Sequence, residues 1–148
     1  MIVKTKKVNK GATLPLYSTS GAACFDLHAC LDESITMFSG ASAIIPTGLS
    51  FEIPEGSVML VFSRSGHAFN QDIRLGNSVG VIDSDFRGEV KVKLRRDSSL
   101  PPTKSFTVTN GDRIAQALIL PVEQVEFRVV EELSKTLRGE IGFGSTGV

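Results

Sequence analysis

The stretch VFSRSGHA (residues 61–68) places Arg64, Ser65 and Gly66 directly after a run of apolar residues. A short helix that begins near Ser65 would present its first backbone N–H groups to whatever lies in front of it. A guanidinium, a hydroxyl and such N–H groups together suit the oxygens of a phosphate. The alternative is a helix cap beside a surface arginine, and this stretch taken alone favours neither interpretation.

A second polar stretch, GNSVGVIDSDFRGEV (76–90), indicates a hairpin followed by an acidic turn. Gly76 and Gly80 suit a close approach of the backbone to a flat ligand. Asp83 and Asp85 are two residues apart, so they would share one face of an extended chain. Paired carboxylates can activate a water molecule or support a hydrated cation. A solvated acidic turn is the more common meaning of such a pair.

Two further stretches combine arginine with polar neighbours. GDRIAQ (111–116) contains Asp112, Arg113 and Gln116, and by itself it indicates a turn followed by a strand with a buried ion pair. RGEIGFGSTG (138–147) has the glycines, hydroxyls and arginine of a phosphate-binding loop. It lacks the lysine of the G-x-x-x-x-G-K-[ST] signature, and disorder is the usual state of such a chain end.

The cysteines and histidines do not form a metal site in this sequence. Cys24 and Cys30 have five residues between them, which is neither a C-x-x-C pair nor a disulfide framework. We expect two reduced, partly buried thiols. His28 and His67 are isolated in the sequence, and we expect each to serve packing or to lie on the surface.

The pattern of apolar residues predicts an all-β fold. Turn residues recur about every ten positions, as in a β-sandwich or barrel-like roll. Alternating or β-branched runs predict strands. One further run has the composition of a helix but is also a continuous apolar stretch that suits a buried strand, so both assignments stay open for it. At one more place the sequence could form a short helical turn. The strands are expected at 57–62, 89–95, 105–109 and 124–130, the open run is 111–120, and the helical turn is 65–72.

Length and charge set limits on the class of protein. A single domain of 148 residues can bury roughly 68–70% of the surface of its unfolded chain. Sixteen basic and sixteen acidic residues give no net charge, which argues against a general nucleic-acid coat. The basic start, residues 1–10, has no apolar run after it, and no stretch reaches the roughly 20 apolar residues of a membrane span. We expect a soluble, cytoplasmic protein that binds neither nucleic acid nor membrane.

Taken together and in order, the polar stretches resemble the trimeric dUTP pyrophosphatase (dUTPase) family over nearly the whole chain. The five motifs of that family match GAACFDLHA (21–29), SRSGHA (63–68), GNSVGVIDSDFRGE (76–89), GDRIAQ (111–116) and RGEIGFGSTG (138–147). The resemblance implies a jelly-roll-like β-barrel or sandwich and a homotrimer whose three active sites are shared between chains. It implies Mg²⁺-assisted hydrolysis of dUTP to dUMP and pyrophosphate, which keeps uracil out of DNA and supplies dUMP for dTMP synthesis.

The same resemblance assigns roles around the phosphates. Asp83 is expected to be the general base, which holds a water molecule in line with the α-phosphorus. Arg64, Ser65 and Gly66 are expected to bind the phosphate chain. Gln116 would position the α-phosphate or the water beside it. The catalytic residues implied are therefore Asp83, Gln116 and Arg64.

Further roles concern the base, the sugar and the metal. Asn77, with the backbone of Gly80 and Val81, is expected to bind the uracil edge. Phe86 stands where the family usually has tyrosine, and its ring is expected to pack against deoxyribose and to preserve sugar discrimination. Asp26 is expected to support the hydrated Mg²⁺ indirectly, through water, while the metal is held mainly by the substrate phosphates.

The resemblance also divides the chain into a jelly-roll domain, residues 1–133, and a flexible arm, residues 134–148. The arm is expected to close over the active site of a neighbouring subunit when substrate binds. Within it, the resemblance assigns substrate contacts to Arg138, Phe143, Gly144, Ser145 and Thr146, with the ring of Phe143 on the uracil and the others near the terminal phosphate.

Two alternatives stay open from the sequence. One is a dCTP deaminase-like enzyme of the same superfamily, although residues 80–89 and 142–147 fit the hydrolase better. The other is a regulatory protein built on the dUTPase fold. The presence of Asp83 argues against a loss of catalysis but does not exclude a second role.

Overall fold

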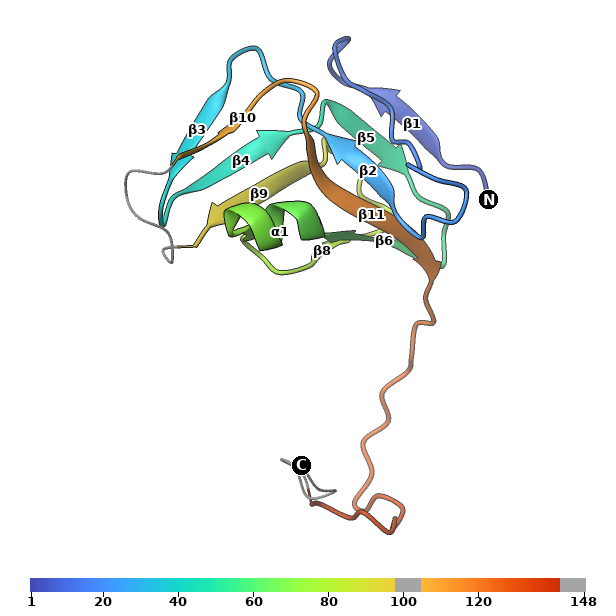
Figure 1. The fold of residues 1–148 in the computed structure, drawn as a ribbon. Coiled ribbons are helices and arrows are strands. Elements are labelled where there is room, and N and C mark those ends of the chain that lie inside the picture. Colours follow the sequence, from blue (N-terminus) through green and yellow to red (C-terminus); the bar gives the residue numbers. More distant parts are fainter. Residues whose placement is uncertain (98–104, 142–148) are drawn as a thin grey trace.

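The computed structural model describes residues 1–97 and 105–141. Within these ranges the chain forms eleven strands and one short helix, so the predicted all-β, jelly-roll-like sandwich is confirmed (Figure 1). The elements in chain order are β1 (Lys4–Lys7), β2 (Phe25–His28), β3 (Ile35–Phe38), β4 (Ser42–Pro46), β5 (Leu49–Glu52), β6 (Ser57–Phe62), α1 (Ser65–Gln71), β7 (Ile73–Leu75), β8 (Gly80–Ile82), β9 (Lys91–Arg96), β10 (Ser105–Val108) and β11 (Arg113–Pro121).

The largest sheet has the strand order β2-β11-β6-β8, and every pairing in it is antiparallel. A second sheet has the order β4-β9-β7, and two short pairs, β1-β5 and β10-β3, complete the sandwich. β11 pairs with β2 on one side and β6 on the other. The open run 111–120 is therefore a buried strand rather than a helix. The predicted strand 57–62 is confirmed as β6.

In β9, buried and exposed side chains alternate strictly, so one face of the strand packs into the core and the other faces solvent. Val92, Leu94 and Arg96 are buried, while Lys91 and its neighbours at every second position are exposed. The strand predicted over 89–95 is thus confirmed with slightly shifted ends. All four sheets contribute to one apolar core, whose most deeply buried members include Leu27, Met37, Ile45, Leu49, Met59, Leu94 and Ile114.

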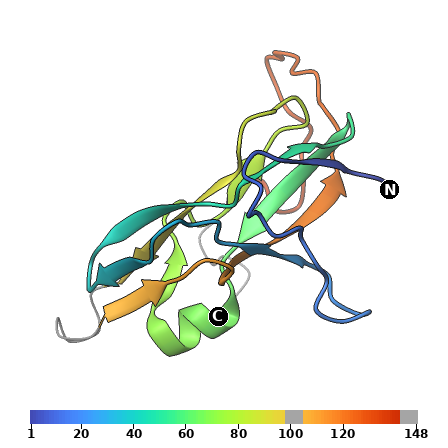
Figure 2. The same cartoon turned by 90° about the horizontal axis from the view of Figure 1, so that it is seen from above.

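The predicted short helix is confirmed as α1, which follows β6 directly. It lies at the outside of the sandwich and contains no buried residue (Figure 2). It ends at Asp72, whose φ of 52° is in the left-handed region. In the described part of the chain, no helix has the length and apolar character to span a membrane.

The hairpin predicted within 76–90 is wrong. β7 pairs with β9 and β8 pairs with β6, so the two strands belong to different sheets. Between them the chain turns tightly: Ser78 has a φ of 64° and donates its backbone N–H to the Leu75 carbonyl at 3.3 Å. Turn residues predict the change of direction, but they do not predict which strands β7 and β8 will pair with.

The strand predicted over 124–130 is also wrong for the single chain. After β11 the chain leaves the body and runs away from it (Figure 1). Val125, Phe127 and Val129 alternate as the sequence indicates, but they are 67%, 91% and 99% exposed. A strand needs a neighbour for its backbone hydrogen bonds, and none of the strands within residues 1–97 and 105–141 pairs with residues 124–130.

Candidate active site

Three of the sequence motifs meet at one open cavity of about 440 Å³. The first motif contributes β2 and the loop before it, the second contributes the turn from β6 into α1, and the fourth contributes β11. Five predicted site residues line this cavity: Asp26, Arg64, Ser65, Gly66 and Gln116.

Sheet register explains why these residues converge. Gln116 on β11 lies opposite Asp26 on β2 and, across its other edge, opposite Phe62 at the end of β6. The Gln116 side-chain amide donates a hydrogen bond to the Ser63 carbonyl at 3.0 Å. The amide therefore lies where β6 ends and the chain turns towards Arg64.

Asp26 is buried at the centre of a small polar cluster, with 8% of its surface exposed. Ser18 donates its hydroxyl to Oδ2 at 2.8 Å, and Arg64 donates Nε to Oδ1 at 3.0 Å. Arg113 donates Nη1 to Oδ2 at 3.4 Å. Burial alone would raise the pKa of Asp26, but the hydrogen bond from Ser18 and the charges of Arg64 and Arg113 hold that pKa below the usual value for aspartate.

Arg64 is not a surface arginine beside a helix cap, which was one of the two sequence interpretations. Its side chain is 22% exposed and paired with Asp26, and as the N-cap of α1 it makes no side-chain capping bond. It also donates Nη1 to the Arg113 carbonyl at 3.3 Å. A guanidinium held in this way is pre-oriented for an anion in the cavity.

His67 has a structural role that its isolation in the sequence did not reveal. Its Nε2 lies 2.7 Å from the Arg113 carbonyl, and its ring packs edge to face on Phe106 with centroids 5.3 Å apart. These contacts tie α1 to β11 and β10. No sequence signal points to the partner, because the contact joins residues 46 positions apart.

The ion pair expected within GDRIAQ has a different partner from the one inside that motif. Arg113 pairs with Asp26 of β2, and its side chain is 50% exposed rather than buried. Asp112 instead accepts a hydrogen bond from the Thr109 backbone N–H at 2.7 Å, which closes the turn before β11.

Both cysteines are free thiols, as expected: Cys24 is partly buried and Cys30 is buried. Cys24 lines the cavity. Burial and the nearby charge of Asp26 raise the pKa of the Cys24 thiol, which is therefore protonated at neutral pH. Burial lowers the pKa of His28, so this partly buried histidine is neutral there.

A second group of predicted site residues lies elsewhere. Asn77, Gly80 and Val81 line a small hollow of about 90 Å³ between β8 and β9. A methyl group on Gly80 would lie 3.1 Å from Cβ of Val61. The glycine therefore allows β8 to pack closely on β6, in addition to any role towards a ligand.

Asp83 lines a third, separate hollow of about 640 Å³ together with Asp85 and Glu55. Register shows how far it is from the cavity that Gln116 lines. Ile82 lies opposite Met59, whereas Gln116 lies opposite Phe62. At about 3.3 Å per residue, Asp83 lies roughly 13 Å along β6 from the level of Gln116, on the other side of that strand.

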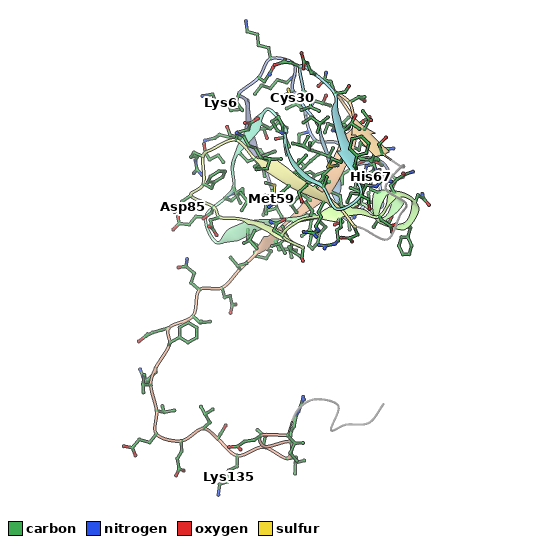
Figure 3. The ribbon with its side chains drawn as sticks, turned by 90° about the vertical axis from the view of Figure 1, so that its left-hand side faces the viewer. Lys6, Cys30, Met59, His67, Asp85 and Lys135 are labelled. Atoms are coloured by element: carbon green, nitrogen blue, oxygen red, sulfur yellow. The ribbon has the colours of Figure 1, made fainter. Side chains whose placement is uncertain are left out.

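Figure 3 shows the same separation, because Asp85 and His67, which mark the two regions, lie on opposite sides of the body. Phe86 follows the acidic turn and is 43% exposed. Arg138 lies on the extended arm, where its Nε donates to the Ile141 carbonyl at 2.9 Å. Four predicted contact residues lie outside the described residues: Phe143, Gly144, Ser145 and Thr146.

Across residues 1–97 and 105–141, no group of three or more His, Cys, Asp or Glu side chains is arranged to hold a metal ion. Asp26 uses both carboxylate oxygens for hydrogen bonds from protein donors. Three protein donors therefore already occupy most of the acceptor capacity of this carboxylate.

Known proteins are similar to this chain in sequence and in fold. Deoxyuridine 5′-triphosphate nucleotidohydrolase of Desulfitobacterium hafniense (strain DSM 10664 / DCB-2) is 48% identical over 141 residues, which are 95% of this chain and 91% of the relative. The protein of the same name from Rhizobium rhizogenes (strain K84) is 47% identical over 141 residues, 94% of this chain and 88% of the relative.

Solved structures agree. The dUTPase of Staphylococcus bacteriophage 80alpha, with dUpNHpp, superposes with a TM-score of 0.88 at 27% identity and covers 99% of both chains. The family model described as dUTPase matches residues 10–147, which is nearly the whole sequence. The chain therefore belongs to the dUTPase family.

Proposed function

We propose that this protein hydrolyses dUTP to dUMP and pyrophosphate. The observation that carries the proposal is the cavity in which Arg64, Ser65, Gly66 and Gln116 converge around the buried Asp26, in a chain of the dUTPase family. The relatives named above are nucleotidohydrolases of deoxyuridine 5′-triphosphate by name. Their names favour this function over the deaminase-like and regulatory alternatives.

The phosphate chain is the group that this cavity suits best. A triphosphate carries about four negative charges, and cationic donors fixed in advance stabilise such charge without reorganising. Arg64 is fixed by Asp26 and by the Arg113 carbonyl. The Ser65 hydroxyl and the Gly66 backbone lie beside it on the cavity wall. Gln116 would contact the α-phosphate or the attacking water.

Asp83 is proposed as the general base. It would take a proton from a water molecule as the water oxygen attacks the α-phosphorus in line with the bridging oxygen. The bond to that bridging oxygen breaks, and pyrophosphate leaves. A positioned base of this kind accelerates a reaction by roughly 10²–10⁴-fold.

The base and the sugar would be bound by the third motif. Asn77 and the backbone of Gly80 and Val81 surround the small hollow beside β9, which suits the edge of a flat ring. A tight fit here would exclude the 5-methyl group of thymine. The half-exposed ring of Phe86 would pack against deoxyribose.

We propose Mg²⁺ as the cofactor, held mainly by the substrate's phosphate oxygens. Mg²⁺ usually keeps several waters and binds through one or two carboxylates together with phosphates. Asp26, whose two oxygens already accept protein hydrogen bonds, fits an outer position that contacts a metal-bound water. When bound, the metal would neutralise charge on the triphosphate and favour the departure of pyrophosphate.

A homotrimer with shared sites accounts for the distribution of these residues. Asp83 and Gln116 of one chain face different hollows. They could act on one nucleotide only if Asp83 of one copy faced Gln116 of another. Closed rotational symmetry makes each such contact recur around the ring of subunits, so three chains would form three equal sites.

The segment after β11 supports assembly independently. It presents Val125, Phe127 and Val129 almost fully to solvent. Apolar residues exposed in a row mark a surface that packs against a partner. We propose that another copy covers this segment.

The chain end would complete the site. We propose that residues 134–148 form an arm that closes over a neighbouring subunit's active site. Phe143 would stack on the uracil. Arg138, together with Gly144, Ser145 and Thr146, would bind the terminal phosphate. Such closure excludes water from the reacting groups.

The replacement Asp83→Asn tests the assignment of the base. The variant should lose at least about a hundredfold in kcat, because the amide cannot accept the proton, and should still bind dUpNHpp. Turnover is measured from pyrophosphate release and binding by calorimetry. Near-normal turnover would remove Asp83 as the base.

The reaction itself is tested by incubating the protein with each deoxynucleoside triphosphate and Mg²⁺ and identifying the products. We expect dUMP and pyrophosphate from dUTP, with little product from the other nucleotides. Ammonia release from dCTP would contradict the proposal and favour a deaminase.

A further inference from the structure

Gly88 lies close to the outer end of the Phe86 ring, the end that carries Cζ. A methyl group at residue 88, in standard geometry, would lie 2.6 Å from Cζ and 3.0 Å from Cε2 of that ring. Such a contact is too short to exist, so a side chain at residue 88 would displace the ring. The φ angle of Gly88 is outside the left-handed region. The backbone conformation alone therefore does not require glycine here.

The backbone around the ring is held by several hydrogen bonds. The Phe86 N–H donates to the Asp83 carbonyl at 3.2 Å, which closes the acidic turn. Arg87 donates Nη1 to the Ser84 carbonyl at 2.6 Å and to the Phe86 carbonyl at 3.0 Å. Because the chain is fixed, a new methyl group would be accommodated mainly by rotation of the Phe86 side chain.

We infer that Gly88 is a specificity-determining residue, which positions the Phe86 ring for discrimination between deoxyribose and ribose. The inference rests on the proposed function, in which that ring packs against the sugar. Gly88 touches no substrate in this account and acts only through the ring. Its lack of a side chain sets where the ring lies, and the ring sets how well a sugar without a 2′-OH fits.

The effect of Gly88→Ala should appear in dUTP binding rather than in the chemical step. A displaced ring loses its packing on deoxyribose, so KM for dUTP should rise. UTP does not gain from that packing, so its kcat/KM should change little. The ratio of kcat/KM for dUTP to that for UTP should fall about tenfold, the scale of a small misfit in an apolar pocket. The kcat for dUTP should stay within about twofold, because the turn that holds Asp83 is unchanged.

Gly11→Ala is a matched control. Gly11 is also an exposed turn glycine outside the left-handed region, and a methyl group there would meet only Asn9 Oδ1, at 3.4 Å. This variant should keep the wild-type ratio. Thermal unfolding and size-exclusion chromatography of both variants report whether the fold and assembly are retained.

A double-mutant cycle tests whether the effect passes through the ring. Phe86→Ala removes the ring and should itself lower the dUTP/UTP ratio. Adding Gly88→Ala to Phe86→Ala should change the ratio no further, because the methyl group then has space. An equal fall with and without the ring would overturn the inference, as would an unchanged ratio in Gly88→Ala.

Other outcomes are equally decisive. If Gly88→Ala fails to fold and the double variant folds, the contact with the ring is supported. If both fail to fold, Gly88 is structural for another reason and the inference is wrong. A wild-type protein with no preference for dUTP over UTP would contradict the proposed function itself, independently of Gly88.

Discussion

Asp26 holds two cationic side chains and a hydroxyl at once, and it does so with little exposure to water. The carboxylate must be ionised to bind Arg64 and Arg113 in this way. Because its pKa is lower in the folded protein than in the unfolded chain, ionisation contributes to the free energy of unfolding. The contribution is fully present above about pH 4, the ordinary range of aspartate, and is lost as the pH falls through the lower folded pKa.

Asp26→Asn should therefore destabilise the protein at pH 7 by about 1–3 kcal/mol, because the partly buried Arg64 and the half-exposed Arg113 lose their anionic partner. The difference from wild type should shrink as the pH falls from about 4 through the lower folded pKa of Asp26, below which the wild-type carboxyl is neutral as well. Denaturant unfolding at a series of pH values measures both effects at a fixed protein concentration.

Asp97→Asn is the control for that experiment. Asp97 pairs with Arg74 at 2.9 Å, but both side chains are more than 40% exposed. An exposed pair contributes little, so this variant should lie within about 0.5 kcal/mol of wild type. A pH-independent loss in Asp26→Asn would contradict the role of ionisation.

At the scale of elements, β11 links the parts of the cavity that is proposed to bind the phosphates. It brings Gln116 next to Asp26 on one side and next to the end of β6 on the other. α1 then fixes the second motif from outside, through the contact of His67 with the Arg113 carbonyl. Strand register therefore places Asp26 and Gln116 at the cavity, and the loop before β2 completes its wall.

Local signals in the sequence predicted the elements that depend on local residues. The strand at 57–62 and the short helix at 65–72 are both present. The hairpin in 76–90 failed because β7 and β8 pair with β9 and β6, which turn residues cannot specify. The strand at 124–130 failed because alternation predicts an extended chain but does not supply a partner.

Deletion of residues 138–148 should leave the fold and the assembly intact, because the strands of the body end at Pro121. We expect a thermal midpoint close to that of wild type and a loss of at least about a hundredfold in kcat/KM, since the proposed closure of the arm and its proposed substrate contacts would be removed. Calorimetry, size-exclusion chromatography and a dUTP assay measure the three quantities.

A longer deletion, residues 122–148, provides the contrast. It also removes the exposed Val125, Phe127 and Val129, so the assembly should dissociate. If the shorter deletion unfolded the protein or yielded monomers, the chain end would be structural and the lid proposal would be wrong.

At the scale of the whole molecule, the candidate site is divided. Asp26, Arg64 and Gln116 share one cavity, while Asp83 faces another hollow. Resemblance to a family supplied the names of these residues, but the spacing of motifs along one chain could not reveal that the chain alone leaves them apart. That separation follows from β8 and β11 lying on opposite sides of β6.

The central claim is that one nucleotide is bound by residues of different copies, and mixing two inactive variants tests it most directly. Asp83→Asn removes the base, and Gln116→Glu places a negative charge against the phosphates, so each variant alone should be almost inactive. Differently tagged chains are refolded together in equal amounts, and mixed assemblies are isolated by both tags.

In such a mixture, an intact site takes Gln116 from an Asp83→Asn chain and Asp83 from a Gln116→Glu chain. In a trimer that contains both variants, one of the three sites has this combination, so we predict recovery of about a third of wild-type dUTP hydrolysis in the isolated mixed assemblies. Mixed assemblies with no more activity than the separate variants would show that Asp83 and Gln116 of the same chain act together, which would contradict the account.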